Sequence, residues 1–170
     1  MEHIVCCKKI GKNTLHSAVV SKTVTASRKT LTKTSVSVEK EPSLEHYKRP
    51  GRNVERPRSD IKLRNHITNK TTYVDFRMQT IKAEATADTP SVQIGEVQKL
   101  NYYQTNYDLD TAGVEVVAAV IDSRGRWGKQ LQEWVKRVAR MGTANKVDYA
   151  HKVYLFRTSI AVAHFLHNQI

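Results

Sequence analysis

The stretch from Gly113 to Met141 constrains this chain more than any other, because it holds the longest apolar run and the clearest basic helix. The run 114–121 is rich in β-branched residues, which predicts a buried strand. Residues 122–128 supply two glycines and several polar residues, which predicts a turn. From Lys129 to Met141 apolar residues recur at helical spacing and basic residues fall opposite them. This pattern predicts an amphipathic basic helix, which Gly142 would end.

Weaker patterns surround this stretch. Val74, Phe76 and Met78 alternate with polar residues and predict a half-buried strand within residues 72–82. A second short strand is expected over residues 91–97, and the polar, tyrosine-rich segment 101–107 is interpreted as a loop. The C-terminal segment 147–170 fits either one or two strands or a continuous helix, and its β-branched and aromatic residues favour strand for 152–163.

Charge is the strongest functional signal in the composition. The net charge is +12 and the sequence pI is about 9.8. Residues 1–70 carry 16 Lys/Arg against 6 acids, residues 71–123 carry 3 against 8, and residues 124–170 carry 9 against 2. Two basic ends therefore flank an acidic middle. Because Lys and Arg release counterions from phosphates, this distribution favours nucleic acid as the partner, with peripheral contact to an acidic membrane surface as the second choice.

The first 60 residues differ in composition from the rest. Residues 3–38 contain no acid and many Ser and Thr, and residues 39–60 hold three of the four prolines. We expect a flexible, disordered basic arm and a Pro/Arg linker over 1–60, followed by one compact domain over 61–170. A cleaved organellar targeting peptide is the alternative for the arm. The expected fold class is α+β, with a β-rich core and one amphipathic basic helix. A jelly-roll-like arrangement is one candidate for that core.

The candidate nucleic-acid contacts are basic residues of the arm, the linker and the domain surface. They are Lys8, Lys9, Lys12, Arg28, Lys29, Lys33, Arg49, Arg52, Arg56, Arg58, Arg124, Arg126, Lys129, Lys136, Arg137 and Arg140.

Signatures of catalysis and cofactor binding are missing from the sequence. It contains no P-loop, no dinucleotide-binding glycine motif, no nucleophile elbow and no paired CxxC, so we expect no cofactor, no metal and no enzymatic activity. An enzyme acting on nucleic acid would need an acidic cluster for metal ions, for which Asp108, Asp110 and Asp122 are the sequence candidates.

Location and membrane association can also be addressed from the sequence. The only cysteines, Cys6 and Cys7, are adjacent and cannot form an ordinary disulfide with each other, which favours a reducing intracellular environment. The sequence has no apolar run of 18 residues and no secretory signal, so no membrane span is expected.

A strand that ends in Asp-x-Arg places Asp122 and Arg124 on the same side of an extended chain, where they can pair with each other or with a neighbouring loop. Gly113, the apolar strand and Ile121-Asp122-Ser123-Arg124 together resemble the motif of the thirty-kilodalton superfamily of plant-virus movement proteins. The later segment VYLFRTSIAV, residues 153–162, is similar to the apolar strand that follows in that family. Over residues 72–163 the resemblance implies a core related to viral jelly rolls, cooperative binding of single-stranded nucleic acid and action at plasmodesmata, with Asp122 as a structural motif residue.

The sequence thus predicts a non-enzymatic, basic viral protein that binds single-stranded RNA or DNA for transport and forms homo-oligomers. A small viral coat protein and an RNA-binding subunit of a large ribonucleoprotein, such as an organellar ribosome, are the alternatives. The corresponding locations are the host cytoplasm or plasmodesmata for a movement protein and the virion for a coat protein.

Overall fold

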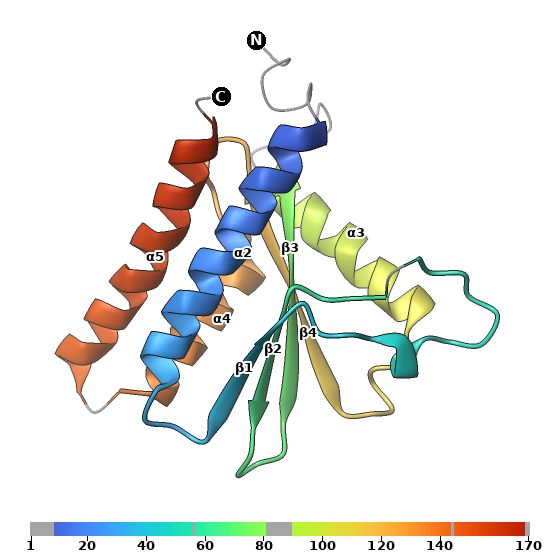
Figure 1. Ribbon diagram of the computed structural model, residues 1–170, viewed down its shortest axis with the longest axis horizontal. Helices are drawn as coiled ribbons and strands as arrows, with labels where there is room; N and C mark the ends of the chain where they lie inside the picture. The colour runs from blue at the N-terminus through green and yellow to red at the C-terminus, as the bar shows by residue number, and fades with distance from the viewer. Residues whose placement is uncertain (1–8, 56, 81–89, 144, 169–170) are drawn as a thin grey trace.

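The computed structural model describes residues 9–55, 57–80, 90–143 and 145–168 (Figure 1). Its elements, in chain order, are α2 (Lys9–Leu31), β1 (Val36–Lys40), the short 3-10 helix η1 (Glu45–Tyr47), β2 (Ile61–Asn65), β3 (Thr71–Gln79), α3 (Ser91–Asn106), β4 (Val114–Asp122), α4 (Lys129–Met141) and α5 (Lys146–Asn168). The predicted α+β class is confirmed.

The four strands form one mixed sheet in the order β1-β2-β3-β4. β1 pairs with β2 and β2 with β3 in antiparallel fashion, whereas β3 and β4 are parallel and are joined through α3. The register between β2 and β3 begins at Ile61 opposite Val74, but β3 continues to Gln79, which lies opposite Asp122 of β4. The second half of β3 therefore has β4 on one side and no β2 on the other.

Helices cover both faces of this sheet (Figure 1). α2, α4 and α5 pack on one face, where Trp134 and Phe156 stack edge to face with ring centroids 5.8 Å apart. α3 covers the other face, where Tyr73, Tyr103 and Tyr107 form a smaller core with Leu44 and Leu109. α3 approaches β4 closely at Gly95, where an added Cβ would lie 2.9 Å from the Val120 side chain.

The expected disordered arm is wrong for the part that the structure describes. Residues 9–31 form α2, which buries Leu15, Val19, Val20 and Val24 in the main core, and residues 36–40 form an edge strand. The buried apolar residues of α2 follow one another at intervals of four, one and four positions, which places them on one helix face, but many Ser and Thr residues interrupt this pattern in the sequence. The predicted boundary at residue 61 therefore does not separate a tail from a domain. Residues 1–8 lie outside the described part.

Three other expectations were wrong about secondary structure. The strand expected over 91–97 and all but the last residue of the loop expected over 101–107 belong to α3, and the strand expected over 152–163 belongs to α5. Tertiary packing overrides β propensity in α5, because Phe156, Ile160 and Ala163 all reach the core only in helical register. With one mixed four-stranded sheet between helices, the described chain is neither β-rich nor a jelly roll.

Within the described residues, no helix is both long enough and apolar enough to cross a bilayer.

Candidate active site

The most unusual cluster of polar residues lies at a gap in the sheet, where pairing with β2 ends and the later residues of β3 have no neighbouring strand on that side. Where β2 stops pairing, the β3 edge at Phe76 still presents a backbone N–H and C=O to the same side. The N–H donates to Asp60 Oδ2 at 2.6 Å, and the C=O accepts from Lys99 Nζ at 2.9 Å. Two residues earlier on the same edge of β3, the Ser59 hydroxyl donates to the Val74 carbonyl at 2.9 Å. Side chains thus replace the missing strand.

Asp60 is held from two directions. It precedes β2, and its Oδ2 lies 3.2 Å from Nε2 of His16 on α2, in addition to the Phe76 contact. The hydrogen bond with Asp60 raises the pKa of His16; burial opposes this effect and the charge of Asp60 adds to it. Burial favours a higher pKa for Asp60, but the hydrogen bonds from His16, Asp75 and the Phe76 N–H outweigh it and lower that pKa. Asp60 is therefore ionised at neutral pH.

Asp75 lies on the α3 face of β3 and meets two side chains of that helix. Its Oδ2 accepts a hydrogen bond from the Tyr103 hydroxyl at 2.7 Å and lies 2.7 Å from Lys99 Nζ. Lys99 and Tyr103 are four residues apart, so they stand on one helix face. The side chains of Asp75 and Lys99 are 16% and 15% exposed, which leaves this ion pair within reach of solvent.

The two carboxyl groups interact with each other. Burial raises the pKa of Asp75; Lys99 opposes this shift, and the charge of Asp60 and a hydrogen bond with it add to it. Two carboxylates in such proximity repel when both are ionised, and either a shared proton or a cation relieves the repulsion. Lys99 already supplies one cation between the Asp75 carboxylate and the Phe76 carbonyl. The site is therefore built to hold positive charge beside two acids.

Asp60 and Asp75 are the side chains of this cluster that could hold a hard divalent cation. The described residues contain no group of three or more His, Cys, Asp or Glu side chains that could hold a metal. Mg²⁺, however, is commonly bound by only one or two carboxylates, with water and substrate phosphate completing its shell. Asp60 and Asp75 offer that number of carboxylates.

The acidic candidates predicted from the sequence do not form a cluster. Asp108 and Asp110 precede β4 and Asp122 ends it, so the length of the strand, about 26 Å at roughly 3.3 Å per residue, lies between them. Asp122 is buried, and it accepts hydrogen bonds from the backbone N–H groups of Arg124 and Arg126 and from Arg126 Nε. It pairs with the Arg126 side chain at 2.6 Å and fixes the turn between β4 and α4.

The predicted nucleic-acid contacts come from separate parts of the fold. Arg137 is half-buried and pairs with Glu115 at 2.7 Å. Exposed side chains belong to Arg28, Lys29, Lys33, Arg49, Arg52, Arg58, Arg124, Arg126, Lys129, Lys136 and Arg140. Lys8 and Arg56 lie outside the described residues, and only the helical backbone of Lys9 and Lys12 is described.

Comparison with known proteins adds no family: the sequence matches no family model and no curated protein.

The sequence did not predict this cluster because Asp60, Asp75 and Lys99 lie on three separate segments of the chain. Asp75 carried a signal nonetheless. It is an acid in the middle of the clearest alternating strand, and Asp60 lies directly before the apolar start of another.

Proposed function

We propose that this protein binds nucleic acid and hydrolyses its phosphodiester backbone, with a divalent cation held by Asp60 and Asp75. The observation that carries the proposal is the pair of interacting carboxyl groups beside Lys99, at a gap in the sheet of a strongly basic protein. The charge of +12 supports a phosphate-rich substrate. Two acids and a lysine at one point support chemistry on that phosphate.

The residues take distinct roles in such a hydrolysis. A water oxygen bonds to phosphorus, the bond from phosphorus to one ester oxygen breaks, and that oxygen takes up a proton. A divalent cation held by Asp60 and Asp75 would lower the pKa of a coordinated water and would neutralise negative charge on the phosphate. Lys99 donates hydrogen bonds to phosphate oxygens as charge develops on them. Tyr103 orients Asp75, and His16 orients Asp60.

This proposal keeps the nucleic-acid partner that the sequence predicts and departs from the predicted non-enzymatic role. The departure rests on Asp60, Asp75 and Lys99, which the sequence did not connect. The transport, coat and ribonucleoprotein roles, homo-oligomer formation and an intracellular location remain predictions, as does the resemblance to movement proteins.

The test is a cleavage assay on the full chain. End-labelled single-stranded DNA, single-stranded RNA and duplex DNA are incubated with wild-type protein in Mg²⁺, in Mn²⁺ and in EDTA. We expect cleavage of at least one substrate with either ion and none in EDTA. Binding without cleavage under every ionic condition would leave a nucleic-acid-binding protein and remove the catalytic part of the proposal.

A further inference from the structure

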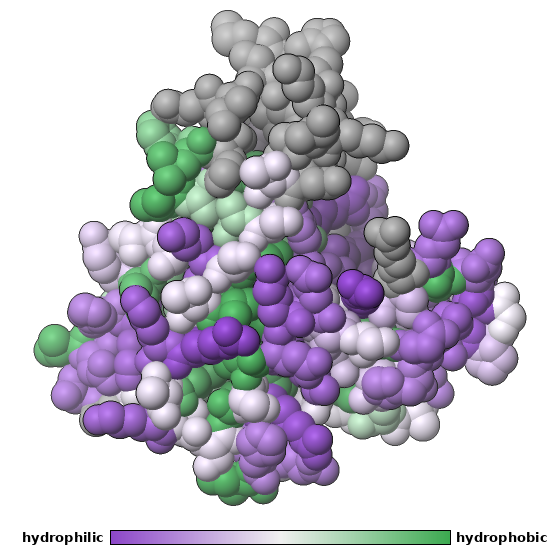
Figure 2. Space-filling model, in the orientation of Figure 1, coloured by the Kyte–Doolittle hydropathy of each residue, from purple (hydrophilic) through white to green (hydrophobic). Residues whose placement is uncertain are grey.

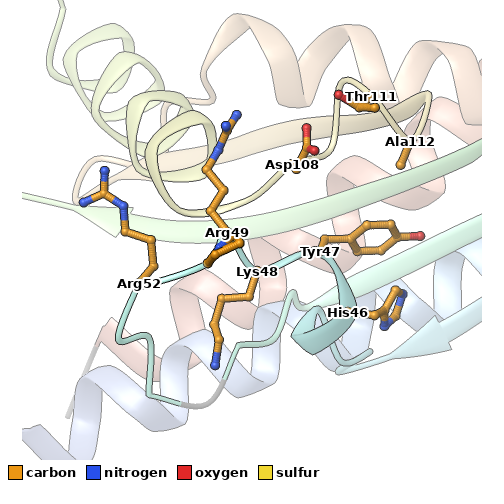
Figure 3. Close-up of a pocket in the computed structure, with 9 residues that line it drawn as sticks. His46, Tyr47, Lys48, Arg49, Arg52, Asp108, Thr111 and Ala112 are labelled. Carbon is orange, nitrogen blue, oxygen red and sulfur yellow. The ribbon is translucent and has the colours of Figure 1, made fainter.

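An open groove of about 670 Å³ lies beside the C-terminal end of α3, and its lining does not include Asp60, Asp75 or Lys99 (Figure 3). The segment 46–52 and residues 108–112 line it, and these segments are tied together by backbone hydrogen bonds from Arg49 N to Asn106 O and from Asp108 N to Tyr47 O. Its volume is within the range of small-molecule and nucleotide sites. Figure 2 shows hydrophilic residues gathered at the right of this face, over the 41–60 segment.

The groove presents two arginines from one tight turn. Pro50 and Gly51 occupy its centre, Gly51 has φ of +75°, and Arg52 N donates to Arg49 O at 3.2 Å. Proline followed by a residue with positive φ defines a type II turn. This turn holds Arg49 and Arg52 at its two ends, and Figure 3 shows both side chains directed to the side of the segment on which Asp108 lies.

The two arginines differ in how firmly they are held. Arg49 Nε donates to the Tyr107 carbonyl at 3.0 Å, which fixes the guanidinium and leaves its terminal nitrogens for a ligand. Arg52 is exposed and forms no ion pair with any residue in the described part of the chain. Lys48 instead pairs with Glu45 at 2.6 Å and points the opposite way in Figure 3. A planar, positioned guanidinium suits phosphate oxygens.

The groove is connected to the cluster along α3. Lys99 and Tyr103 lie on successive turns of α3, and Tyr107 directly follows its last residue; the rings of Tyr103 and Tyr107 have centroids 5.4 Å apart. Eight residues of helix span about 12 Å.

We propose that this groove binds, through Arg49 and Arg52, backbone phosphates of the same nucleic-acid strand that is cleaved at the carboxylate cluster. The inference rests on the proposed function for its ligand. Asp108 is the one acid in the lining, and its charge opposes a phosphate. Removing that charge therefore tightens binding, whereas removing the arginines weakens it.

The experiment measures fluorescence anisotropy of labelled duplex DNA with the full chain in EDTA, over a series of salt concentrations. Because charge-assisted hydrogen bonds are lost, Arg52→Ala should weaken binding about tenfold, and Arg49→Gln/Arg52→Ala should weaken it further. The double variant should also make the slope of log K against log salt shallower by about 2, since each phosphate contact contributes about 0.9. Asp108→Asn should bind more tightly than wild type.

The matched control is Lys146→Ala/Arg157→Ala, which removes two exposed charges from α5 and should leave the slope unchanged. Equal slopes for the groove variant and this control would overturn the inference. Cleavage in Mg²⁺ is measured in parallel. If wild-type protein cleaves DNA but the groove variant and the control have equal salt slopes, only the inference about the groove is overturned. If wild-type protein neither binds nor cleaves DNA, the proposed function is overturned as well.

Discussion

Lys99 on α3 and Asp75 on β3 form an ion pair of 2.7 Å between the helix and the sheet, and the same ammonium group donates to the Phe76 carbonyl at the unpaired β3 edge. The lysine therefore completes a backbone edge and neutralises a carboxylate at once. This geometry is compatible with a structural role and with a catalytic role of Lys99. A structural role is tested by the effect of substitution on stability, and a catalytic role by its effect on cleavage.

Removing Lys99 should cost stability by an amount that depends on Asp75. Loss of one partner leaves a half-buried carboxylate uncompensated, so Lys99→Met should lower the free energy of unfolding by about 1–2 kcal/mol. The figure is below that for a fully buried pair, because solvent reaches both groups and Asp75 can take up a proton. Urea unfolding of Lys99→Met, Asp75→Asn and the double variant measures this coupling. Strictly additive losses would show that the two side chains do not interact.

Glu115 and Arg137 should make stability depend on pH. Burial favours a higher pKa for Glu115, but the hydrogen bond and charge of Arg137, with Thr72 and Lys70, outweigh it and lower that pKa. A lowered carboxyl pKa stabilises the native state above the unfolded-state value, near 4.5, and this contribution is lost as pH falls through the folded-state pKa.

The measurement for this pair is urea unfolding of wild type and Glu115→Gln between pH 3 and pH 7. Because both side chains are partly exposed, the difference should be about 0.5–1 kcal/mol at neutral pH and should shrink at acid pH. A difference that grows as pH falls would contradict the assignment.

Gly128 should tolerate no side chain while Glu96 is present. The Glu96 carboxylate accepts from the Gln130 N–H at 2.8 Å at the start of α4, and a Cβ on Gly128 would collide with that carboxylate. Gly128→Ala should therefore destabilise the protein by about 1–2 kcal/mol, partly through loss of this cap. In a Glu96→Ala background the same substitution should cost clearly less. An equal cost in both backgrounds would place the strain elsewhere.

The helix at the C-terminus can be tested with two neighbouring aromatics. In α5, Phe156 is fully buried against Trp134, whereas Tyr154 is 66% exposed. Phe156→Ala should cost about 3–5 kcal/mol, and Tyr154→Ala should cost within about 0.5 kcal/mol. In a strand the two residues would share a face and both substitutions would matter. Thermal unfolding of the two variants separates these cases.

The central strand and the basic helix could be predicted because their patterns are continuous. Val114–Asp122 and Lys129–Met141 appear in the structure with nearly the expected bounds. α2 was missed because Thr23, Ser27 and Thr30 are buried among its apolar residues. Thr23 satisfies its hydroxyl by donating to the Val19 carbonyl, a local bond that a composition argument does not reveal.

The candidate site was beyond the sequence for a different reason. Asp60 and Asp75 interact because β2 starts opposite Val74 and leaves the rest of β3 unpaired on that side, and Lys99 meets Asp75 because α3 crosses the sheet at that point. Register and crossing position come from packing, which no local pattern encodes. Seeking acids among adjacent residues therefore pointed to Asp108, Asp110 and Asp122 instead.

The most direct test of the account is single-turnover cleavage in Mg²⁺ by wild type, Asp60→Asn, Asp75→Asn and Asp110→Asn. Asparagine keeps an oxygen that can accept the existing hydrogen bonds, and unfolding midpoints confirm that each variant is folded. Asp110 is exposed and outside the cluster, so it controls for loss of a charge. We predict that Asp60→Asn and Asp75→Asn each lower the rate at least about 100-fold and that Asp110→Asn leaves it unchanged. Cleavage by folded Asp60→Asn and Asp75→Asn at the wild-type rate would contradict the account.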